Sequence, residues 1–337
     1  MLEKPDLPED KILACLKSNY GLPVIQLTFL PIGADLNTAV YRGISDSGRS
    51  YFIKLKWTFF NEIAVKLPRF LNDHGILQVM AAIPSKTGQL WSDLPPCSLI
   101  LYDFIEGQDG YAVNMSGRQW LEFGQFLKKI HSMHLPPALR GAIPQETYSP
   151  QWRERLAAFL ERIKLIDPSD PLIVETALFL NKRRAEILDL IHRTESLAQN
   201  LKTCSLESIM CHADIHAGNI LIASNGTIYL VDWDTPILAP KERDLMSIGG
   251  GLFGGWRSPD EEQTLFYQGY GREQLDQTAL AYYRYERIIQ DLEVECEQIF
   301  SATGNGQDRE QAFHFMKSNF QPGNVLEIAR GSDRATG

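Results

Sequence analysis

Two histidines, an aspartate and an asparagine lie within the eleven residues CHADIHAGNIL, residues 211–221. Three of these, His212, Asp214 and His216, are spaced at i, i+2 and i+4, so their side chains would share one face of an extended segment. Imidazole and carboxylate groups on one face can hold a metal ion, as in some metal-dependent hydrolases. One interpretation of the segment is therefore a metal site.

A second interpretation combines Asp214 with Asn219. The pattern H-x-D-x-x-x-x-N is the spacing of the kinase catalytic loop, in which the aspartate accepts the proton of the substrate hydroxyl or orients that hydroxyl. The asparagine of that loop ligates a magnesium ion whose phosphates come from the opposite side. A polar loop whose histidines only hydrogen-bond the backbone is a third interpretation, and the segment alone does not decide between a structural and a functional role.

The residues that follow this segment favour the kinase-like interpretation. After an NG turn, YLVDWD (229–234) has the pattern of a buried strand that ends at Asp232, where kinases place their second metal-binding aspartate. Asp214, Asn219 and Asp232 together offer only oxygen ligands, which suit Mg²⁺ and are a poor set for zinc. The sequence therefore indicates a magnesium-dependent phosphoryl-transfer site.

Phosphoryl transfer of this kind also needs a lysine on a sheet, and YFIKL (51–55) supplies Lys54. Alternation along that strand puts Phe52, Lys54 and Lys56 on one face, so Lys54 would point into a cleft beside Phe52. Glu62 begins the helical pattern NEIAVKLPRFL at a suitable distance to be the ion-pair partner of Lys54. A residue favoured at a helix start by the helix dipole is an equally simple account of Glu62, and Lys56 is the rival lysine.

These side chains belong to a chain whose pattern changes near residue 106. Before that point, strands are predicted at VIQLTFLPIG, TAVYRGIS, SYFIKLKW and SLILYDFIEG, with helices at DKILACLKSNYGL and NEIAVKLPRFLNDHG. From about residue 116 the periodicity is nearly all helical, interrupted by the strand candidates NILIAS and TIYLVDW. We therefore predict an α+β protein with a small strand-rich lobe, 1–106, that ends in a hinge, and a mainly helical lobe, 107–337.

Charge and composition argue against several classes of partner. The 337 residues include 33 Lys and Arg against 42 Asp and Glu, a net charge of −9, and no basic block that would follow a nucleic-acid backbone. No segment approaches the ~20 apolar residues of a membrane span, and the N-terminus does not resemble a signal peptide. The five cysteines are never spaced C-x-x-C, which indicates a reducing compartment. We expect a soluble, cytoplasmic, monomeric protein that binds neither nucleic acid nor membrane.

With Lys54, Glu62, HADIHAGNI and VDWD in that order, the chain resembles the aminoglycoside phosphotransferase family over most of its length. The segments FLKKIHSMH, RDLMSIG and FYQGYG are similar to further family motifs. The resemblance implies a bilobal protein-kinase-like fold whose small lobe, an antiparallel sheet plus a helix, binds nucleotide. It also implies ATP and Mg²⁺ as cofactors and transfer of the γ-phosphoryl group to a hydroxyl of an aminocyclitol or aminoglycoside antibiotic, a cationic small molecule.

The resemblance assigns roles residue by residue. Asp214 would be the catalytic aspartate, and Asn219 and Asp232 would be the magnesium ligands. Lys54 would contact the phosphates with Glu62 as its partner. Tyr102 would line the back of the adenine pocket, and the Asp103 carbonyl and the Ile105 amide would contact the adenine edge. His212 would have a structural role, and Asp244 would brace the catalytic loop.

Two parts of the site are less clearly marked in the sequence. The phosphate-covering loop should lie at IGADLNTAVYRG, which keeps Gly33 but lacks G-x-G-x-x-G. A cationic acceptor needs carboxylates and aromatic rings. The side chains that could provide them, on or near the predicted helix AYYRYERIIQDLEVECEQIF, are Asp234, Trp256, Tyr283, Glu286, Asp291 and Glu295.

Three other functions are compatible with parts of this pattern. A small-molecule kinase of the same fold that acts on choline, homoserine or a sugar would share every motif and differ only in its acceptor. A metal-dependent hydrolase would use His212 and His216 as ligands. A kinase-like binding module without activity would be expected to lack one of the carboxylates, and none of them is missing.

Overall fold

The computed structural model describes residues 3–33, 35, 37–57, 61–163, 170–300, 306–321 and 323–334. Its contacts divide the chain into two compact units. Unit 1 comprises Met1–Gln119, His134–Ile143 and Ala217–Pro236, and unit 2 comprises Trp120–Met133, Pro144–His216 and Ile237–Gly337. The single boundary at 106/107 predicted from the sequence differs from this division, because two later stretches of chain pack into unit 1.

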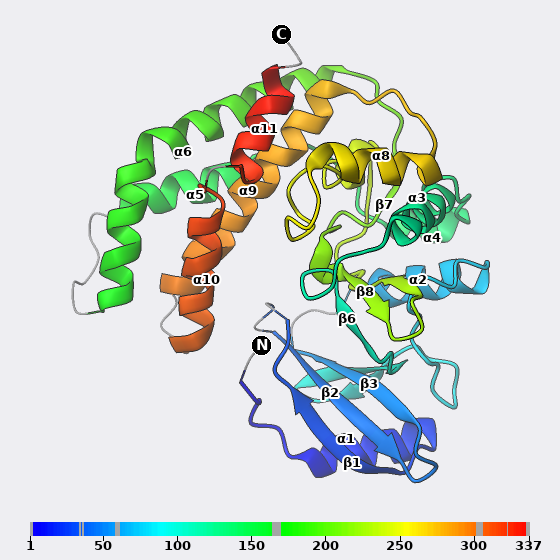
Figure 1. Ribbon diagram of the computed structural model, residues 1–337. Helices are drawn as coiled ribbons and strands as arrows, with labels where there is room; N and C mark the ends of the chain where they lie inside the picture. Colours follow the sequence, from blue (N-terminus) through cyan, green and yellow to red (C-terminus); the bar gives the residue numbers. More distant parts are fainter. Residues whose placement is uncertain are drawn as a thin grey trace. The chain divides into compact units, whose positions relative to one another are not determined.

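A five-stranded antiparallel sheet in the order β1-β2-β3-β5-β4 organises unit 1 (Figure 1). Its strands are β1 (Val24–Leu30), β2 (Thr38–Ser45), β3 (Ser50–Lys56), β4 (Ser92–Leu94) and β5 (Cys97–Asp103). On one face, α1 (Glu9–Cys15) and the turn of π-helix that continues it (Leu16–Tyr20) cover the sheet. Ile12, Ile53 and Leu99 are fully buried in the core on this face, as the alternating pattern of β3 requires.

The opposite face of the sheet carries a second, smaller apolar cluster. Phe52 and Tyr102 lie side by side in the paired strands β3 and β5 and pack with Val65 of α2 (Ile63–Asp73). Lys54 follows Phe52 on this face, as the alternation in the sequence predicts. The helix α2 continues through Pro68.

Short strands complete both units. In unit 1, β6 (Gly107–Asp109), β8 (Ile220–Ala223) and β9 (Ile228–Leu230) form a three-stranded antiparallel sheet, preceded at β8 by a 3-10 turn, Ala217–Asn219. The short helix α4 (Pro137–Ala142) also belongs to unit 1. In unit 2, β7 (Ile209–Cys211) pairs with β10 (Ile237–Ala239).

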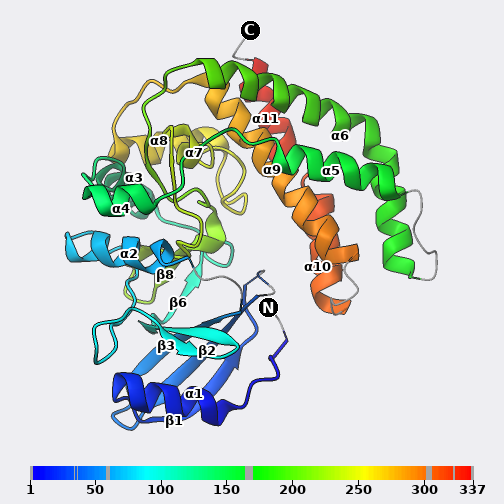
Figure 2. The ribbon, with the colours of Figure 1, turned by 180° about the vertical axis from the view of Figure 1, so that it is seen from behind.

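Unit 2 is mainly helical, and α9 is its central helix. The helix packs against α5, α6, α7, α10 and α11, which Figure 2 shows from behind. Tyr283, Ile289 and Cys296 of α9 are fully buried. The helices are α3 (Gly117–His131, beginning in unit 1), α5 (Gln151–Arg162), α6 (Pro171–Thr203), α7 (Glu242–Leu245), α8 (Pro259–Tyr270), α9 (Gln277–Phe300), α10 (Gly306–Ser318) and α11 (Val325–Arg334).

Two glycines allow α3 and α8 to approach each other closely in unit 2. A Cβ atom at Gly269 would lie 1.9 Å from the Leu121 carbonyl oxygen, and one at Gly124 would lie 2.2 Å from the Phe266 carbonyl oxygen. Both obstacles are backbone atoms within helices, so neither can turn aside. This helix crossing therefore requires glycine at both positions.

Gly269→Ala is therefore expected to lower the free energy of unfolding by roughly 1–3 kcal/mol, since α3 and α8 must separate to admit the methyl group. Urea unfolding of the two proteins measures the difference. Gly141→Ala is the matched control, because Gly141 is also helical but has no heavy atom within 4 Å of an added Cβ. The control should be neutral or more stable by up to about 1 kcal/mol, and equal stability of both variants would contradict the close helix crossing.

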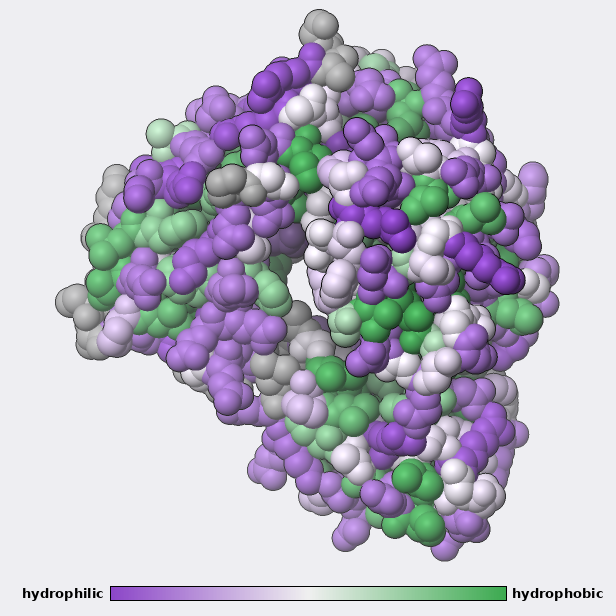
Figure 3. All heavy atoms as spheres, viewed as in Figure 1, coloured by the Kyte–Doolittle hydropathy of each residue, from purple (hydrophilic) through white to green (hydrophobic). Residues whose placement is uncertain are grey.

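The structure confirms the predicted α+β class, with an antiparallel sheet in the N-terminal part and helices through most of the rest. Among the described residues, no helix combines the length and apolarity needed to cross a bilayer. Polar side chains predominate on the face shown in Figure 3, and hydrophobic ones form separate patches there. Large exposed apolar side chains such as Ile25, Leu77 and Leu178 lie in separate parts of the chain, namely β1, the turn after α2, and α6.

Candidate active site

Lys54 of β3 binds two carboxylates that follow β9 in unit 1. Its Nζ lies 2.9 Å from Asp232 Oδ1 and 3.0 Å from Asp234 Oδ1. Burial alone would lower the pKa of Lys54, but the charges of Asp232 and Asp234 raise it above its usual value. The ammonium group of Lys54 is therefore held in its charged form by the two carboxylates of the VDWD motif.

The predicted ion pair between Lys54 and Glu62 does not form in this structure, where each residue binds other partners. Glu62 lies at the N-terminal boundary of α2, and its carboxylate binds Lys66, one turn further along the helix. Both of these side chains are about half exposed. The simpler account of Glu62 as a helix-start residue fits this position, since a carboxylate is favoured there by the helix dipole.

Asp234, predicted as an acceptor contact, is instead held by two lysines of β3. Its Oδ2 binds Lys56 and its Oδ1 binds Lys54. Burial would raise the pKa of Asp234, but the two ammonium groups hold it below its usual range. Lys54 and Lys56 reach the same carboxylate because residues two apart in a strand share one face.

Lys56 also reaches the segment predicted to cover the phosphates. Its Nζ lies 3.6 Å from Asp35 Oδ2, and Asp35 accepts hydrogen bonds from the Asn37 amide at 2.8 Å and the Thr38 hydroxyl at 2.7 Å. Lys56 thus connects the start of β2 to the carboxylate of Asp234, all within unit 1. The lysine considered as a rival of Lys54 is a second member of the same cluster.

Asn219 and Asp232 are brought together by the pairing of β8 with β9. Ile220 lies opposite Leu230 in the register, and the Val231 amide donates to the Asn219 carbonyl at 3.0 Å. Asp232, which follows Val231, has the left-handed φ of 61°. A side-chain amide and a carboxylate in this position are oxygen ligands that fit Mg²⁺.

The segment with the hinge resemblance lies at the end of β5. Tyr102 is buried against Phe52, with ring centroids 6.2 Å apart, and burial raises the pKa of its hydroxyl above the usual value. Asp103 is exposed and binds Arg49, and Ile105 is partly buried beyond the strand. Gly33 has a left-handed φ of 87°, which glycine adopts without strain.

Lys54→Met is expected to lower kcat/KM for ATP by about 10²- to 10³-fold, because the predicted contact of a preorganised charge with the phosphates would be lost. Lys56→Met should cost about tenfold, since Lys54 still binds Asp234. Steady-state kinetics at varied ATP concentration measure both effects. Lys66→Met, which removes the exposed partner of Glu62, is the control, and its kcat/KM for ATP should stay within about twofold of the wild type. A loss as large as that of Lys54→Met would indicate that the Glu62–Lys66 pair belongs to the site.

The loop that carries Asp214 belongs to unit 2, and its backbone is bound by the carboxylate of Asp244 in α7. Asp244 Oδ2 accepts from the His212 amide at 2.9 Å, and its Oδ1 accepts from the Ala213 amide at 2.7 Å. Ala213 has a left-handed φ of 71°, a strained conformation for a residue with a Cβ. The fully buried carboxylate of Asp244 therefore fixes the backbone just before Asp214.

The metal-site interpretation of His212, Asp214 and His216 does not match these contacts. His212 is fully buried, and its Nδ1 accepts a hydrogen bond from the Asp214 amide at 3.2 Å. His216 Nε2 lies 3.7 Å from Asp214 Oδ2. His212 therefore supports the loop backbone, as the resemblance implies, and this hydrogen bond occupies its Nδ1.

Among the described residues, the one group with the geometry of a metal site is His131, Cys211 and Asp244. Both nitrogens of His131 are already used, since Nε2 lies 2.9 Å from Asp244 Oδ2 and Nδ1 lies 2.8 Å from the Tyr270 hydroxyl. Burial raises the pKa of the Cys211 thiol well above its usual value, so the thiolate that a metal needs is disfavoured. This cluster is a buried hydrogen-bond network that holds Asp244.

Asp214 itself is bound by an arginine that the sequence analysis missed. Nη1 of Arg287, on α9, donates to Asp214 Oδ1. Burial would raise the pKa of Asp214, but the charges of Arg287 and His216 hold it well below its usual range. The carboxylate is therefore ionised at neutral pH. Arg287 could have been found from its spacing, because it precedes the acidic candidate Asp291 by one helical turn.

The candidate acceptor contacts of unit 2 separate into two groups. Tyr283 is fully buried beside Tyr148, and Glu286 is buried and bound to Arg153, so both belong to the helical core and do not fit the predicted role. Their positions follow from α9 being surrounded by other helices. Asp291 and Trp256 remain partly exposed and accessible.

Comparison with known proteins gives a consistent assignment. Residues 28–286 match the phosphotransferase enzyme family. The chain is 37% identical to a spectinomycin phosphotransferase, APH(9)-Ia, solved with ADP and spectinomycin, over 98% of this chain and 100% of that one, with a TM-score of 0.90. A second structure of that protein, bound to AMP, gives 36% identity over 95% and 98% of the two chains and a TM-score of 0.85.

The likeness extends to a more distant enzyme. An amicoumacin kinase bound to AMP-PNP and Ca²⁺ shares the fold at 19% identity, with a TM-score of 0.62 over 96% of this chain and 94% of that one. The fold and the family match agree with the lysine and carboxylate cluster of unit 1 and with the braced aspartate of unit 2. The chain belongs to the aminoglycoside phosphotransferase family, and it is a kinase that transfers a phosphoryl group to a hydroxyl acceptor.

Proposed function

We propose that the protein is an ATP- and Mg²⁺-dependent O-phosphotransferase that phosphorylates a hydroxyl group of an aminocyclitol antibiotic, spectinomycin, and so confers resistance to it. The observation that carries the proposal is the 37% identity to a spectinomycin phosphotransferase over 98% of this chain. The net charge of −9 is compatible with a cationic acceptor.

The proposed reaction is a direct in-line transfer. Lys54 contacts the phosphates, and the backbone of Asp103 and Ile105 would contact the adenine edge against Tyr102. Asp214 orients the acceptor hydroxyl and takes up its proton as the oxygen attacks the γ-phosphorus and the bond to the leaving ADP breaks. Asn219 and Asp232 would hold Mg²⁺, which neutralises phosphate charge when bound. The ionised state of Asp214 supports its role as the proton acceptor.

A coupled assay of ADP release tests the acceptor. Spectinomycin, kanamycin, streptomycin, choline, homoserine and methylthioribose are compared with Mg-ATP at equal concentration. Turnover with spectinomycin alone would support the proposal. Turnover with another acceptor would show that the proposed substrate is wrong, while the proposed type of reaction would stand. A parallel measurement with GTP determines the donor preference.

The setting proposed for the enzyme is the cytoplasm, where ATP is supplied and thiols stay reduced. All five cysteines are free in the structure, which fits a reducing compartment. We propose that it acts as a monomer without nucleic-acid or membrane partners. Gel filtration at micromolar concentration would show a mass near 38.2 kDa if this is correct.

A further inference from the structure

Arg287 bridges two carboxylates within unit 2. Its Nη1 donates to Asp214 Oδ1, and its Nε lies 2.8 Å from Asp291 Oδ1 and 3.0 Å from Asp291 Oδ2. Asp291 follows Arg287 by four residues, so both side chains lie on one face of α9. Only 18% of the Arg287 side chain is exposed, so water screens these pairs less than it would on an open surface.

We propose that Arg287 is a positioning residue for phosphoryl transfer: by bridging Asp214 to Asp291 it fixes the direction in which the catalytic carboxylate meets the acceptor hydroxyl. The inference rests on the proposed function of Asp214. It concerns a residue of α9 that neither the kinase motif nor the magnesium ligands include.

The backbone before Asp214 is already fixed by Asp244, but the carboxylate can still rotate about its own side-chain bonds. The guanidinium group is planar and presents its donors in a rigid fork, so it restrains a carboxylate in direction as well as in position. Asp291 in turn restrains the guanidinium from the other side. A near-attack arrangement requires the hydroxyl oxygen to lie about 3 Å from its acceptor, and small errors of aim lower the rate strongly.

The charges around Asp214 leave Arg287 as its principal counter-ion. His216 is further away, with Nε2 at 3.7 Å from Asp214 Oδ2. Glu295, one turn beyond Asp291, is buried, and its Oε2 has no hydrogen-bond partner among the described residues. Burial and the charge of Asp291 raise the pKa of Glu295 well above its usual value, which disfavours the charged form that would compete for Arg287.

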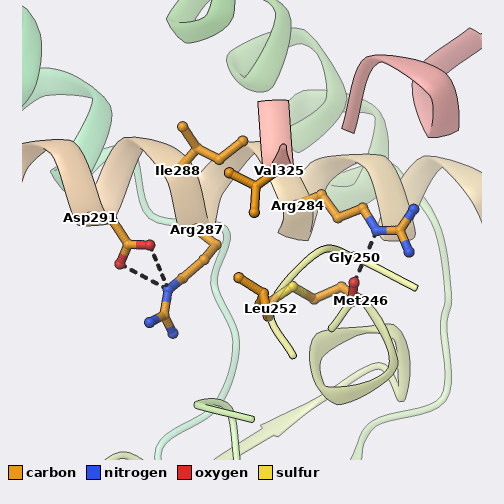
Figure 4. A pocket seen from close by; sticks show the side chains of 8 residues that line it. All are labelled: Met246, Gly250, Leu252, Arg284, Arg287, Ile288, Asp291 and Val325. Carbon is orange, nitrogen blue, oxygen red and sulfur yellow. Dashed lines mark hydrogen bonds and ion pairs between the residues drawn. The ribbon is translucent and has the colours of Figure 1, made fainter. Parts of the chain in front are cut away.

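Figure 4 shows the Arg287–Asp291 half of the bridge on the wall of a pocket of unit 2. Arg287 and Asp291 line this pocket together with Met246, Gly250, Leu252 and other residues of unit 2. In this view the guanidinium group of Arg287 extends away from Ile288 and Val325, its apolar neighbours on the pocket wall. The charged end of Arg287 therefore lies on the Asp291 side of the pocket lining, away from its apolar part.

Kinetics of Arg287→Met and Arg287→Lys test the inference. Arg287→Met keeps a long side chain without charge and is expected to lower kcat about 10- to 100-fold, with the KM for ATP and for the acceptor changed less than about threefold. The acid limb of the kcat–pH profile should move upward by at least about one pH unit, because Asp214 loses the charge that favours its ionised form. Arg287→Lys should recover part of the rate and of the shift.

Arg155→Met is the matched control. Arg155 of α5 also binds carboxylates of α9, but these belong to Glu293 and Glu297 and not to the Asp214 loop. Its kcat and pH profile should match the wild type within about twofold. An unchanged kcat and pH profile in Arg287→Met would overturn the inference, and so would faster turnover, which would make Arg287 an obstruction.

A measurement on the unaltered protein does not depend on turnover or on the folding of any Arg287 variant. The ¹³C resonance of the Asp214 carboxyl group, identified by its loss in Asp214→Asn, is titrated with pH. A midpoint well below the usual range of aspartate supports the bridge, and a midpoint near 4 overturns it. If no acceptor in the panel reacts while this midpoint is low, the proposed function fails and the Arg287–Asp214 pair stands.

Discussion

Asp214→Ala lowers kcat by about 10³-fold or more in our expectation, and it leaves the affinity for Mg-ATP nearly unchanged. In the proposed mechanism the carboxylate orients the attacking hydroxyl and accepts its proton, and general-base assistance together with positioning contributes on this scale. The nucleotide contacts are expected from unit 1, whereas Asp214 belongs to unit 2. Single-turnover kinetics of product formation measure the chemical step, and calorimetry measures nucleotide binding.

Asp333→Asn is the control for this loss. Asp333 also forms an Asp–Arg pair in unit 2, with Arg193, and its side chain is only 15% exposed. The control removes a similar ion pair without touching the catalytic loop, so its rate should stay within about twofold. Near-normal turnover by Asp214→Ala would remove this residue from the mechanism, whatever the acceptor.

The second large effect is expected for Asp232→Ala. Removing this carboxylate should weaken Mg²⁺-dependent ATP binding by more than about 100-fold, because a metal bound through one or two protein carboxylates loses a charged ligand. Binding of ATP without magnesium should persist, since Lys54 keeps its contact with Asp234 and gains freedom to reach the phosphates. Titrations of ATP with and without Mg²⁺ distinguish the two effects.

Asp234→Asn provides the comparison within the same cluster. It removes a carboxylate bound by both lysines while the two residues predicted as magnesium ligands stay in place. The gain in ATP affinity on adding Mg²⁺ should survive in Asp234→Asn and disappear in Asp232→Ala. The reverse result would make Asp234 the metal ligand and Asp232 the partner of the lysines.

The sequence predicted the parts of the fold that carry a strong local pattern. The predicted strands 38–45 and 50–57 agree with β2 and β3 to within one residue, because alternation and a DSG turn mark them. The three-residue strands β6, β7 and β10 were not predicted. Gly107–Asp109 has no preference for extended structure, and its pairing with β8 depends on a segment more than 100 residues away.

Ion pairs were predicted less well than positions along the chain. The same-face rule placed Lys54 and Lys56 together, but their partners come from the end of β9, 178 residues further on. Glu62 was predicted to be the partner of Lys54 because of its distance along the sequence, whereas in the structure it forms an ion pair with Lys66, one helical turn away. Burial of Tyr283 and Glu286 likewise depends on helices that pack around α9, which helical periodicity alone does not identify.

The segment Ala217–Pro236 packs with unit 1 although it lies between two stretches of unit 2 along the gene. In a crossover between related genes near residue 106, the strand lysines would therefore come from one parent and both predicted magnesium ligands from the other. A crossover after Pro236 would keep the whole lysine and carboxylate cluster from one parent and take α8 to α11 from the other. Recombination at this later point would preserve the donor half of the reaction, whereas Asp244 and Arg287, which hold Asp214 and its loop, would come from the other parent.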